Sequence, residues 1–278
     1  MKNYFLAVFT AASFVACTSD IEEIAVDQPQ EEQTSELAAK TLTVSGTYAR
    51  VRRNTHHINN NIWSRDANSK GTGNQSVWSY DINNWGTYGS HSRGDNQIKS
   101  YPSLIIGKHY GDGPNSSQNM PIRIRDVRSA VTNWSTQCNF ARGNTSYDIW
   151  FDNSKNPSGE NDYELMIWLN RKNLNPIAHR YDANGAVPRF RNVKIGNYRF
   201  NVYEATVASG LRVFTFLSTS NRNSVSNLNI KSFANYVINK GWMKNSVYMT
   251  SVQAGFEIVE GRNFDCKATK FSLNVRKN

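Results

Sequence analysis

The stretch DYELMIWLN, residues 162–170, sets one glutamate among apolar side chains. Successive side chains of a β-strand point to opposite faces of the sheet. One face of this stretch would then be entirely apolar, with Tyr163, Leu165, Ile167 and Leu169. The other face would carry Glu164, Met166 and Trp168. Because a solvated face would carry Lys, Thr or Ser beside the acid, we predict a sandwich strand whose glutamate lies in a groove.

A second stretch, YMTSVQAGFEIVEG at residues 248–261, repeats this pattern far downstream. Its core face is predicted to carry Val252, Ala254, Phe256 and Ile258. The opposite face holds small or polar residues around one carboxylate: Ser251, Gln253, Gly255 and Glu257. We expect Glu260 to lie in a loop beyond this strand.

A third stretch, SYDIWFD at residues 146–152, also pairs acids with an indole. Its apolar face would hold Tyr147, Ile149 and Phe151, and its other face Asp148, Trp150 and Asp152. Three such strands predict one cleft lined with carboxylates and indoles. Indoles stack on the apolar faces of sugar rings, and two carboxyl groups that flank a glycosidic bond can act as nucleophile and acid/base. The pattern therefore indicates polysaccharide chemistry.

The composition favours an all-β fold. The 278 residues are 38% hydrophobic and 12% aromatic, which supplies a core and excludes global disorder. Short aromatic or β-branched runs are separated by Asn, Gly and Ser, a pattern typical of a sandwich or barrel. One helix is predicted in NIKSFANYVINKGW, residues 229–242, and we expect it to pack on the outside of the sandwich.

The N-terminus predicts an export signal. Residues 1–16 combine one lysine with an apolar run too short to span a bilayer, and Cys17 follows. This resembles a bacterial lipoprotein signal peptide with Cys17 as the lipidated residue; ordinary secretion, with Cys17 lost or free, is the alternative. Residues 17–40 carry seven acids and predict a flexible acidic tether. We expect an outer-membrane lipoprotein that faces the cell surface or periplasm, with one folded domain at residues 41–278.

Charge, cysteine and histidine usage indicate which partners and bound groups to expect. Residues 41–278 carry 30 basic and 15 acidic side chains, a net charge of +15. The basic residues are scattered and no nucleic-acid motif is present, so we expect no nucleic-acid partner. Cys138 and Cys266 either pair or remain buried thiols. The neighbouring His56 and His57 lack metal-ligand spacing, and we expect neither a metal nor a cofactor.

Seven segments carry a resemblance to a known family. They are NNIWS (60–64), NQIKSYP (96–102), YDIWFD (147–152), DYELMIWL (162–169), NPI (175–177), FANYVINKGW (233–242) and QAGFEIVEG (253–261). Their order and approximate spacing resemble glycoside hydrolase family 12, which comprises endo-β-1,4-glucanases and xyloglucan-specific endoglucanases. The resemblance implies a β-jelly roll of two curved antiparallel sheets, with the substrate cleft on the concave face and the catalytic domain at residues 41–278.

The resemblance also implies roles for individual residues. Glu164 resembles the nucleophile, Glu257 the general acid/base, and Asp148 an acid that tunes this pair. Pro176 falls in a loop that crosses one end of the cleft. Met166 is expected beneath the reacting sugar and Trp63 in a stacking subsite. Trp78 and Trp85, in Asn- and Ser-rich segments, are either exposed sugar platforms or core residues. The remaining candidate substrate-binding residues are Asn61, Trp168 and Gln253.

Together these observations predict a retaining endo-acting hydrolase of internal β-1,4-glucosyl links. Glu164 would attack the anomeric carbon while Glu257 protonates the departing oxygen, which requires carboxyl groups about 5–5.5 Å apart. The substrate stays open among xyloglucan, mixed-linkage glucan and amorphous cellulose. A non-catalytic polysaccharide-binding lipoprotein is the alternative, although a binding module gains nothing from two close acids. We expect a monomer.

Overall fold

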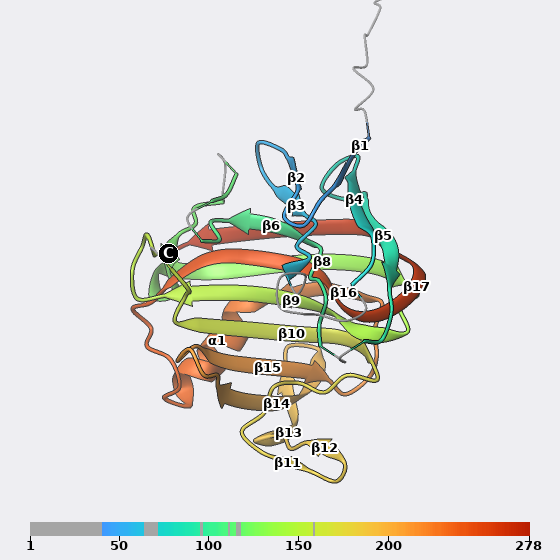
Figure 1. The fold of residues 1–278 in the computed structure, drawn as a ribbon. Coiled ribbons are helices and arrows are strands. Elements are labelled where there is room, and N and C mark those ends of the chain that lie inside the picture. Colours follow the sequence, from blue (N-terminus) through green and yellow to red (C-terminus); the bar gives the residue numbers. More distant parts are fainter. Residues whose placement is uncertain (1–40, 64–71, 95–96, 111, 115–117, 158) are drawn as a thin grey trace, which may run out of the picture. The chain divides into compact units, whose positions relative to one another are not determined.

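Two curved β-sheets stack on each other and enclose the core in this computed structural model (Figure 1). The structure describes residues 41–63, 72–94, 97–110, 112–114, 118–157 and 159–278. All of these residues belong to one compact unit. The predicted signal peptide at residues 1–16, the lipidation candidate Cys17 and the tether at residues 17–40 lie outside the described residues.

The first sheet, here called the inner sheet, contains the three strands predicted to carry the acids. Its strands lie in the order β2 (Arg50–Arg52), β3 (His57–Asn59), β6 (Ser103–Gly107), β17 (Tyr248–Lys277), β9 (Arg142–Asp152), β10 (Tyr163–Lys172), β15 (Arg212–Ser218), β14 (Tyr198–Thr206) and β13 (Phe190–Ile195). The short β7 (Ile122–Arg123) pairs with the start of β17. The described strands of this sheet pair antiparallel as predicted, except that β10 and β15 run parallel. Between them the chain crosses to the edge of the sheet as β13 and returns through β14.

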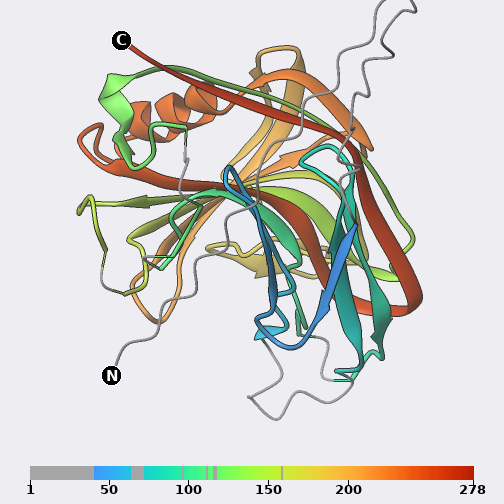
Figure 2. The same cartoon turned by 90° about the horizontal axis from the view of Figure 1, so that it is seen from above.

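The second sheet, here called the outer sheet, shares one strand with the first. Its strands lie in the order β1 (Leu42–Ser45), β4 (Gln75–Ser79), β5 (Trp85–His91), β17, β8 (Val127–Cys138) and β16 (Ser224–Asn229). The first part of β17 pairs with β9, and its last part pairs with β5 and β8 after a bend that Figure 2 shows. Glu260 still pairs with Arg142 of β9. The prediction that Glu260 lies in a loop is therefore wrong, because the strand continues through the bend with a bulge.

The predicted faces of the three acid-bearing strands are confirmed. Their apolar sides point into the main core, which contains Tyr147, Ile149, Phe151, Leu165, Ile167, Leu169, Val252, Ala254, Phe256 and Ile258. Burial of each large apolar side chain contributes about 1.5–3 kcal/mol relative to exposure. Because this face is anchored in the core, the residues that alternate with it must project from the other side of the inner sheet. We call that side the cleft face.

The predicted helix is α1 (Ile230–Asn239), and the Asn229 side chain caps its first turn. The Phe233 ring lies 5.1 Å from the ring centroids of both Phe200 on β14 and Phe216 on β15. The helix therefore closes the core behind β14 and β15. We had expected it to pack on the outside of the sandwich. The remaining short elements are the 3-10 helix η2 (Ile124–Asp126) and the hairpin strands β11 (Tyr181–Asp182) and β12 (Gly185–Ala186).

A disulfide joins Cys138 to Cys266. The sequence left this pairing open, and the strand register explains it, because the two residues lie opposite each other on β8 and β17. The bond joins neighbouring strands of the outer sheet across a sequence separation of 128. Within the described part of the chain, no helix has both the length and the apolar character that crossing a membrane requires.

Candidate active site

A cleft lies on the cleft face of the inner sheet. It encloses a cavity of about 390 Å³, and its wall combines carboxylates, aromatic rings and one thioether. Three of the lining residues are the acids singled out from the sequence, Asp148, Glu164 and Glu257.

Strand pairing brings the acids together from distant parts of the sequence. Glu164 on β10 lies opposite Trp150 of β9, and Asp148 follows on the same face of β9. Gln253 of β17 lies opposite Asp148 from the other side, and Glu257 lies further along β17 on the same face. Three adjacent strands of one curved sheet therefore present all three carboxyl groups to the same space.

Asp148 and Glu164 form a hydrogen-bonded carboxyl pair. Burial raises the pKa of Asp148 to about 7, while its hydrogen bonds to Glu164 and to the indole of Trp150 oppose that rise. The pKa of Glu164 is raised well above its usual value by burial and then by the charge and hydrogen bond of Asp148. A hydrogen bond between two carboxyl groups requires one proton, so the pair carries one proton and one negative charge when it is half titrated.

Glu257 has a different environment. Burial raises its pKa to about 8, and the charge of Glu164 adds to this rise. The side-chain amide of Asn144 donates a hydrogen bond to Glu257 Oε2 and opposes the rise, because it stabilises the ionised form. Asn144 is fully buried and lies opposite Glu257 in the pairing of β9 with β17. At neutral pH Glu257 therefore holds a proton that it can donate.

The phenol of Tyr101 lies close to the three acids. Its hydroxyl donates a hydrogen bond to the Ser146 carbonyl at 3.1 Å. Burial raises the pKa of Tyr101 well above its usual value, and the charges of Asp148, Glu257 and Glu164 raise it further. Tyr101 lines the cleft together with all three acids. No group of three His, Cys, Asp or Glu side chains is placed to hold a metal ion within the described ranges.

Aromatic rings form one wall of the cleft. Trp63 is 45% exposed, which leaves its indole available for stacking. The His109 ring lies 5.1 Å from that of Trp150 and 4.3 Å from that of Tyr110. Burial lowers the pKa of His109 to about 4, with the charge of Arg50 adding to the effect, so the imidazole is neutral at pH 7. The wall is therefore uncharged and suited to the apolar faces of sugar rings.

The cleft also contains four of the predicted substrate-binding residues: Asn61, Trp63, Met166 and Gln253. Gln253 is buried, and its Oε1 accepts a hydrogen bond from the Ser103 hydroxyl at 3.2 Å. Its Nε2 has no hydrogen-bond partner among the described residues. This amide is therefore free to donate to a ligand in the cleft.

Trp78 and Trp85 do not line the cleft, and of the two alternatives left open for Trp85 the structure shows the core residue. Trp85 is fully buried in the core, with its ring 5.8 Å from that of Phe256. Trp78 lines a hollow on the exposed side of the outer sheet. The register of β4 with β5 pairs Trp78 with Gly86 and Trp85 with Ser79. The two indoles therefore project from opposite faces of one hairpin.

Trp168 and Pro176 are also not exposed to the cleft, contrary to the prediction. Trp168 points to the cleft side but is only 2% exposed, because it packs in a second apolar cluster with Ala178 of the following loop. Pro176 is buried, and its carbonyl accepts a hydrogen bond from the Tyr181 hydroxyl at 3.0 Å. Its neighbour Ile177 is the loop residue that lines the cleft.

Several lining residues were not predicted from the sequence: Ile98, Tyr101, His109, Tyr110 and Glu160. Trp150 lines the cleft as its alternation onto the face of Asp148 predicted. His109 and Tyr110 follow β6 in a segment with no strand periodicity. Only the folded arrangement brings them to the acids.

The model of glycosyl hydrolase family 12 matches residues 54–276. Endoglucanase S from Pectobacterium parmentieri is 31% identical over 244 residues, which cover 82% of this chain and 87% of that protein. Xyloglucan-specific endo-beta-1,4-glucanase A from Emericella nidulans is 26% identical over 224 residues, 78% of this chain and 84% of that protein. The native family 12 xyloglucanase from Bacillus licheniformis superimposes with a TM-score of 0.74 at 27% identity, over 84% of this chain and 100% of that one. The chain therefore belongs to glycosyl hydrolase family 12.

Proposed function

We propose that the protein is an endo-acting β-1,4-glucan hydrolase that retains the anomeric configuration. The observation that supports this most strongly is the placement of Glu164 and Glu257 in one cleft with unequal surroundings. Glu164 shares its hydrogen bond with a second acid, whereas Glu257 is bonded by the neutral amide of Asn144. Two acids held in different environments are suited to the two different roles that glycoside hydrolysis requires.

In the first step, an ionised oxygen of Glu164 attacks the anomeric carbon. The bond between that carbon and the glycosidic oxygen breaks, and Glu257 transfers its proton to this oxygen. The raised pKa of Glu257 supports this role, because the acid must remain protonated until the bond breaks. Burial, and after it the charge and hydrogen bond of Asp148, raise the pKa of Glu164, so Asp148 helps to set the pH above which Glu164 is ionised and can attack.

In the second step, the ionised Glu257 takes a proton from a water molecule. The resulting hydroxide attacks the same anomeric carbon and displaces Glu164, which is released as a carboxylate. Each displacement inverts the configuration, so the product retains the original one. Gln253, with its unpartnered Nε2 beside Asp148, is placed to donate to a sugar hydroxyl during both steps.

Among β-glucans, we propose xyloglucan as the preferred substrate. The relatives from Emericella nidulans and Bacillus licheniformis are both xyloglucan-acting by name, and that from Pectobacterium parmentieri is an endoglucanase. Exposed Trp63 and Ile177 both line the cleft, which suits a chain that extends past the reacting sugar. A surface-anchored enzyme also suits a soluble branched glucan better than crystalline cellulose.

The decisive experiment combines product analysis on tamarind xyloglucan, barley β-glucan and carboxymethylcellulose with binding to the same polymers. Early release of mixed oligosaccharides, most rapidly from xyloglucan, supports the proposal. Glu164→Gln and Glu257→Gln should each abolish release while the fold and oligosaccharide binding persist. Binding without any release by the unaltered protein would instead identify a non-catalytic polysaccharide-binding protein.

We further propose that the protein is exported and anchored to the outer membrane through a lipid on Cys17, with the acidic segment 17–40 as a tether. The disulfide between Cys138 and Cys266 supports an oxidising compartment. In a Gram-negative host, Cys17→Ala should move the protein from the membrane fraction to the soluble exported fraction. An unchanged membrane fraction would contradict the anchor, and gel filtration of the soluble form should give a monomer.

A further inference from the structure

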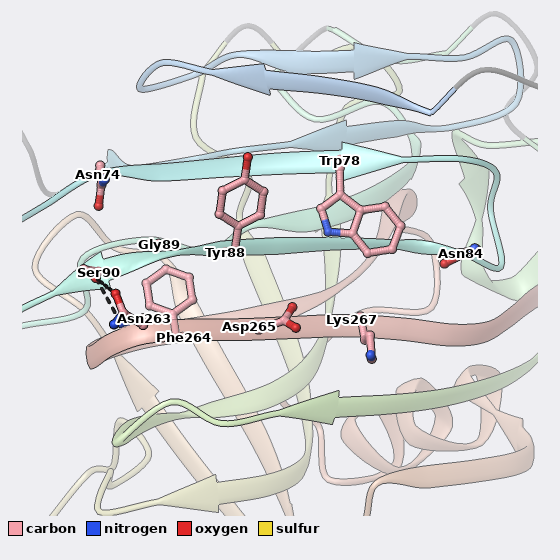
Figure 3. Close-up of a pocket in the computed structure, with 10 residues that line it drawn as sticks. All are labelled: Asn74, Trp78, Asn84, Tyr88, Gly89, Ser90, Asn263, Phe264, Asp265 and Lys267. Atoms are coloured by element: carbon pink, nitrogen blue, oxygen red, sulfur yellow. Dashed lines mark hydrogen bonds between the residues drawn. The ribbon is translucent and has the colours of Figure 1, made fainter.

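A second hollow lies on the exposed side of the outer sheet, away from the core. Its volume is about 620 Å³, and strands β4, β5 and β17 form its floor (Figure 3). It shares no lining residue with the catalytic cleft. Side chains that alternate with its lining, such as Val77 and Cys266, point into the core between the two sheets. The hollow and the cleft therefore open on different layers of the sandwich.

Trp78 forms the first platform of this hollow. It projects from β4 across to Gly86, its register partner on β5. A Cβ atom at Gly86 would lie 3.0 Å from two ring carbons of the indole, closer than such contacts normally allow. The absence of a side chain at Gly86 therefore lets the indole lie against the backbone of β5. One ring face is held by the sheet, and Trp78 stays partly exposed.

Tyr88 forms a second platform beside the first. It pairs with Ser76 and is therefore the diagonal neighbour of Trp78 on the same face. Diagonal neighbours of this kind have Cα atoms about 7–8 Å apart. Tyr88 is 47% exposed, and Figure 3 shows both rings above the strands of one sheet. Two rigid aromatic rings are thus presented side by side, at a spacing that neighbouring sugars of one chain can cover.

Two charged side chains lie beside these rings. Asp265 lies opposite Tyr88 on β17, and Lys267 lies opposite Gly86. Among the described residues, neither charged group forms an ion pair, and neither the indole N–H nor the phenol hydroxyl has a hydrogen-bond partner. One carboxylate and one ammonium balance each other, so the lining offers hydrogen bonds without a net charge. This chemistry fits a neutral polyhydroxylated chain better than a polyanion.

We propose that this hollow is a second binding site for a neutral β-glucan chain, remote from the catalytic cleft. The proposal rests on the proposed function, because it assumes that the enzyme meets such polymers. A chain held by Trp78 and Tyr88 would stay close to the enzyme between cleavage events. The local concentration of polymer at the cleft would then rise without any change in the chemistry of Glu164 and Glu257.

The test uses Glu164→Gln as the parent, so that polymer is bound without being cut. Migration in native gels containing tamarind xyloglucan or barley β-glucan measures affinity, and calorimetry with cellohexaose measures the number of sites. The double change Trp78→Ala and Tyr88→Ala should weaken polymer binding roughly tenfold and reduce two sites to one. Tyr88→Phe keeps the ring and should keep the affinity. Asn133→Ala, on the outer sheet but outside the hollow, should change nothing.

Kinetics separate this proposal from the proposed function. With an intact Glu164, the double variant should hydrolyse a short chromogenic cello-oligosaccharide at the unaltered rate and polymer more slowly. Thermal unfolding confirms that the variants fold. Equal gel migration and a single site in both proteins would overturn the second site. Absence of hydrolysis by the unaltered enzyme would overturn the proposed function, whatever the outer sheet binds.

Discussion

Asn144 should set the alkaline limit of activity. Its amide donates to Glu257 Oε2, and this hydrogen bond lowers the pKa of an acid that burial and Glu164 otherwise raise to about 8. Asn144→Leu keeps the approximate side-chain volume and removes the donor. The ionised form of Glu257 then loses its stabilising partner, and its pKa should rise.

The size of the effect follows from the kind of bond. A hydrogen bond to a charged group contributes about 1.5–3 kcal/mol, and one pKa unit corresponds to about 1.36 kcal/mol. Loss of the Asn144 bond should therefore raise the pKa of Glu257 by about 1–2 units. Because the first step needs protonated Glu257, activity is lost as the pH rises through this pKa. The alkaline limb of kcat/KM should move upward by the same amount.

The assay is the pH dependence of kcat/KM on a soluble chromogenic cello-oligosaccharide, with circular dichroism at each pH to confirm the fold. The matched control is Asn170→Leu, because Asn170 donates to Asn223 at 2.9 Å and does not line the cleft. The control should leave the alkaline limb in place. An alkaline limb that stays fixed or moves downward in folded Asn144→Leu would refute Glu257 as the proton donor.

Three further predictions concern the carboxyl pair of Asp148 and Glu164, the exposed indole in the cleft, and the disulfide. Asp148→Asn removes the charge that raises the pKa of Glu164, so the acidic limb of kcat/KM should move to lower pH while the rate falls. Trp63→Ala should raise KM roughly tenfold on oligosaccharides with little change in unfolding temperature, because the exposed indole stacks on sugar and supports no core. Replacement of Cys138 and Cys266 by Ala should lower the free energy of unfolding by about 2–4 kcal/mol in denaturant titrations, and a reducing agent should destabilise only the parent.

Alternation predicted the faces of the long strands because their two sides differ strongly. In β10 one side carries only Tyr163, Leu165, Ile167 and Leu169, all packed in or against the core, whereas the other side carries an acid, so the face of Glu164 follows directly. The same contrast holds for β17 around Glu257. This pattern does not show which strands lie next to each other. The pairing of β9 with β10 and β17 is what brings Asp148, Glu164 and Glu257 together.

The tryptophans of the β4–β5 hairpin show where alternation fails. In β5, Trp85 and Thr87 point inward while Gly86 and Tyr88 point outward, so neither side is uniformly apolar. Without the register of β4 with β5, the sequence gives no reason to bury Trp85 and expose Trp78. The pairing of the two strands makes that choice.

The prediction that Trp168 is exposed to the cleft was wrong for a different reason. Its face was assigned correctly, but the loop that contains Ala178 folds back over it. A covering loop is a long-range contact that strand periodicity does not encode. His109 shows the reverse, since a residue outside any periodic segment packs on Trp150 in the cleft wall.

In the proposed mechanism Glu164 forms a covalent bond to the sugar while Glu257 carries the proton. A 2-deoxy-2-fluoro-cellobiosyl fluoride traps such an intermediate, and mass spectrometry of the digested protein locates it. We predict one label per chain, on Glu164 within the stretch DYELMIWLN. A label on Asp148 or Glu257, or a hydrolytically active enzyme that is never labelled, would contradict the mechanism.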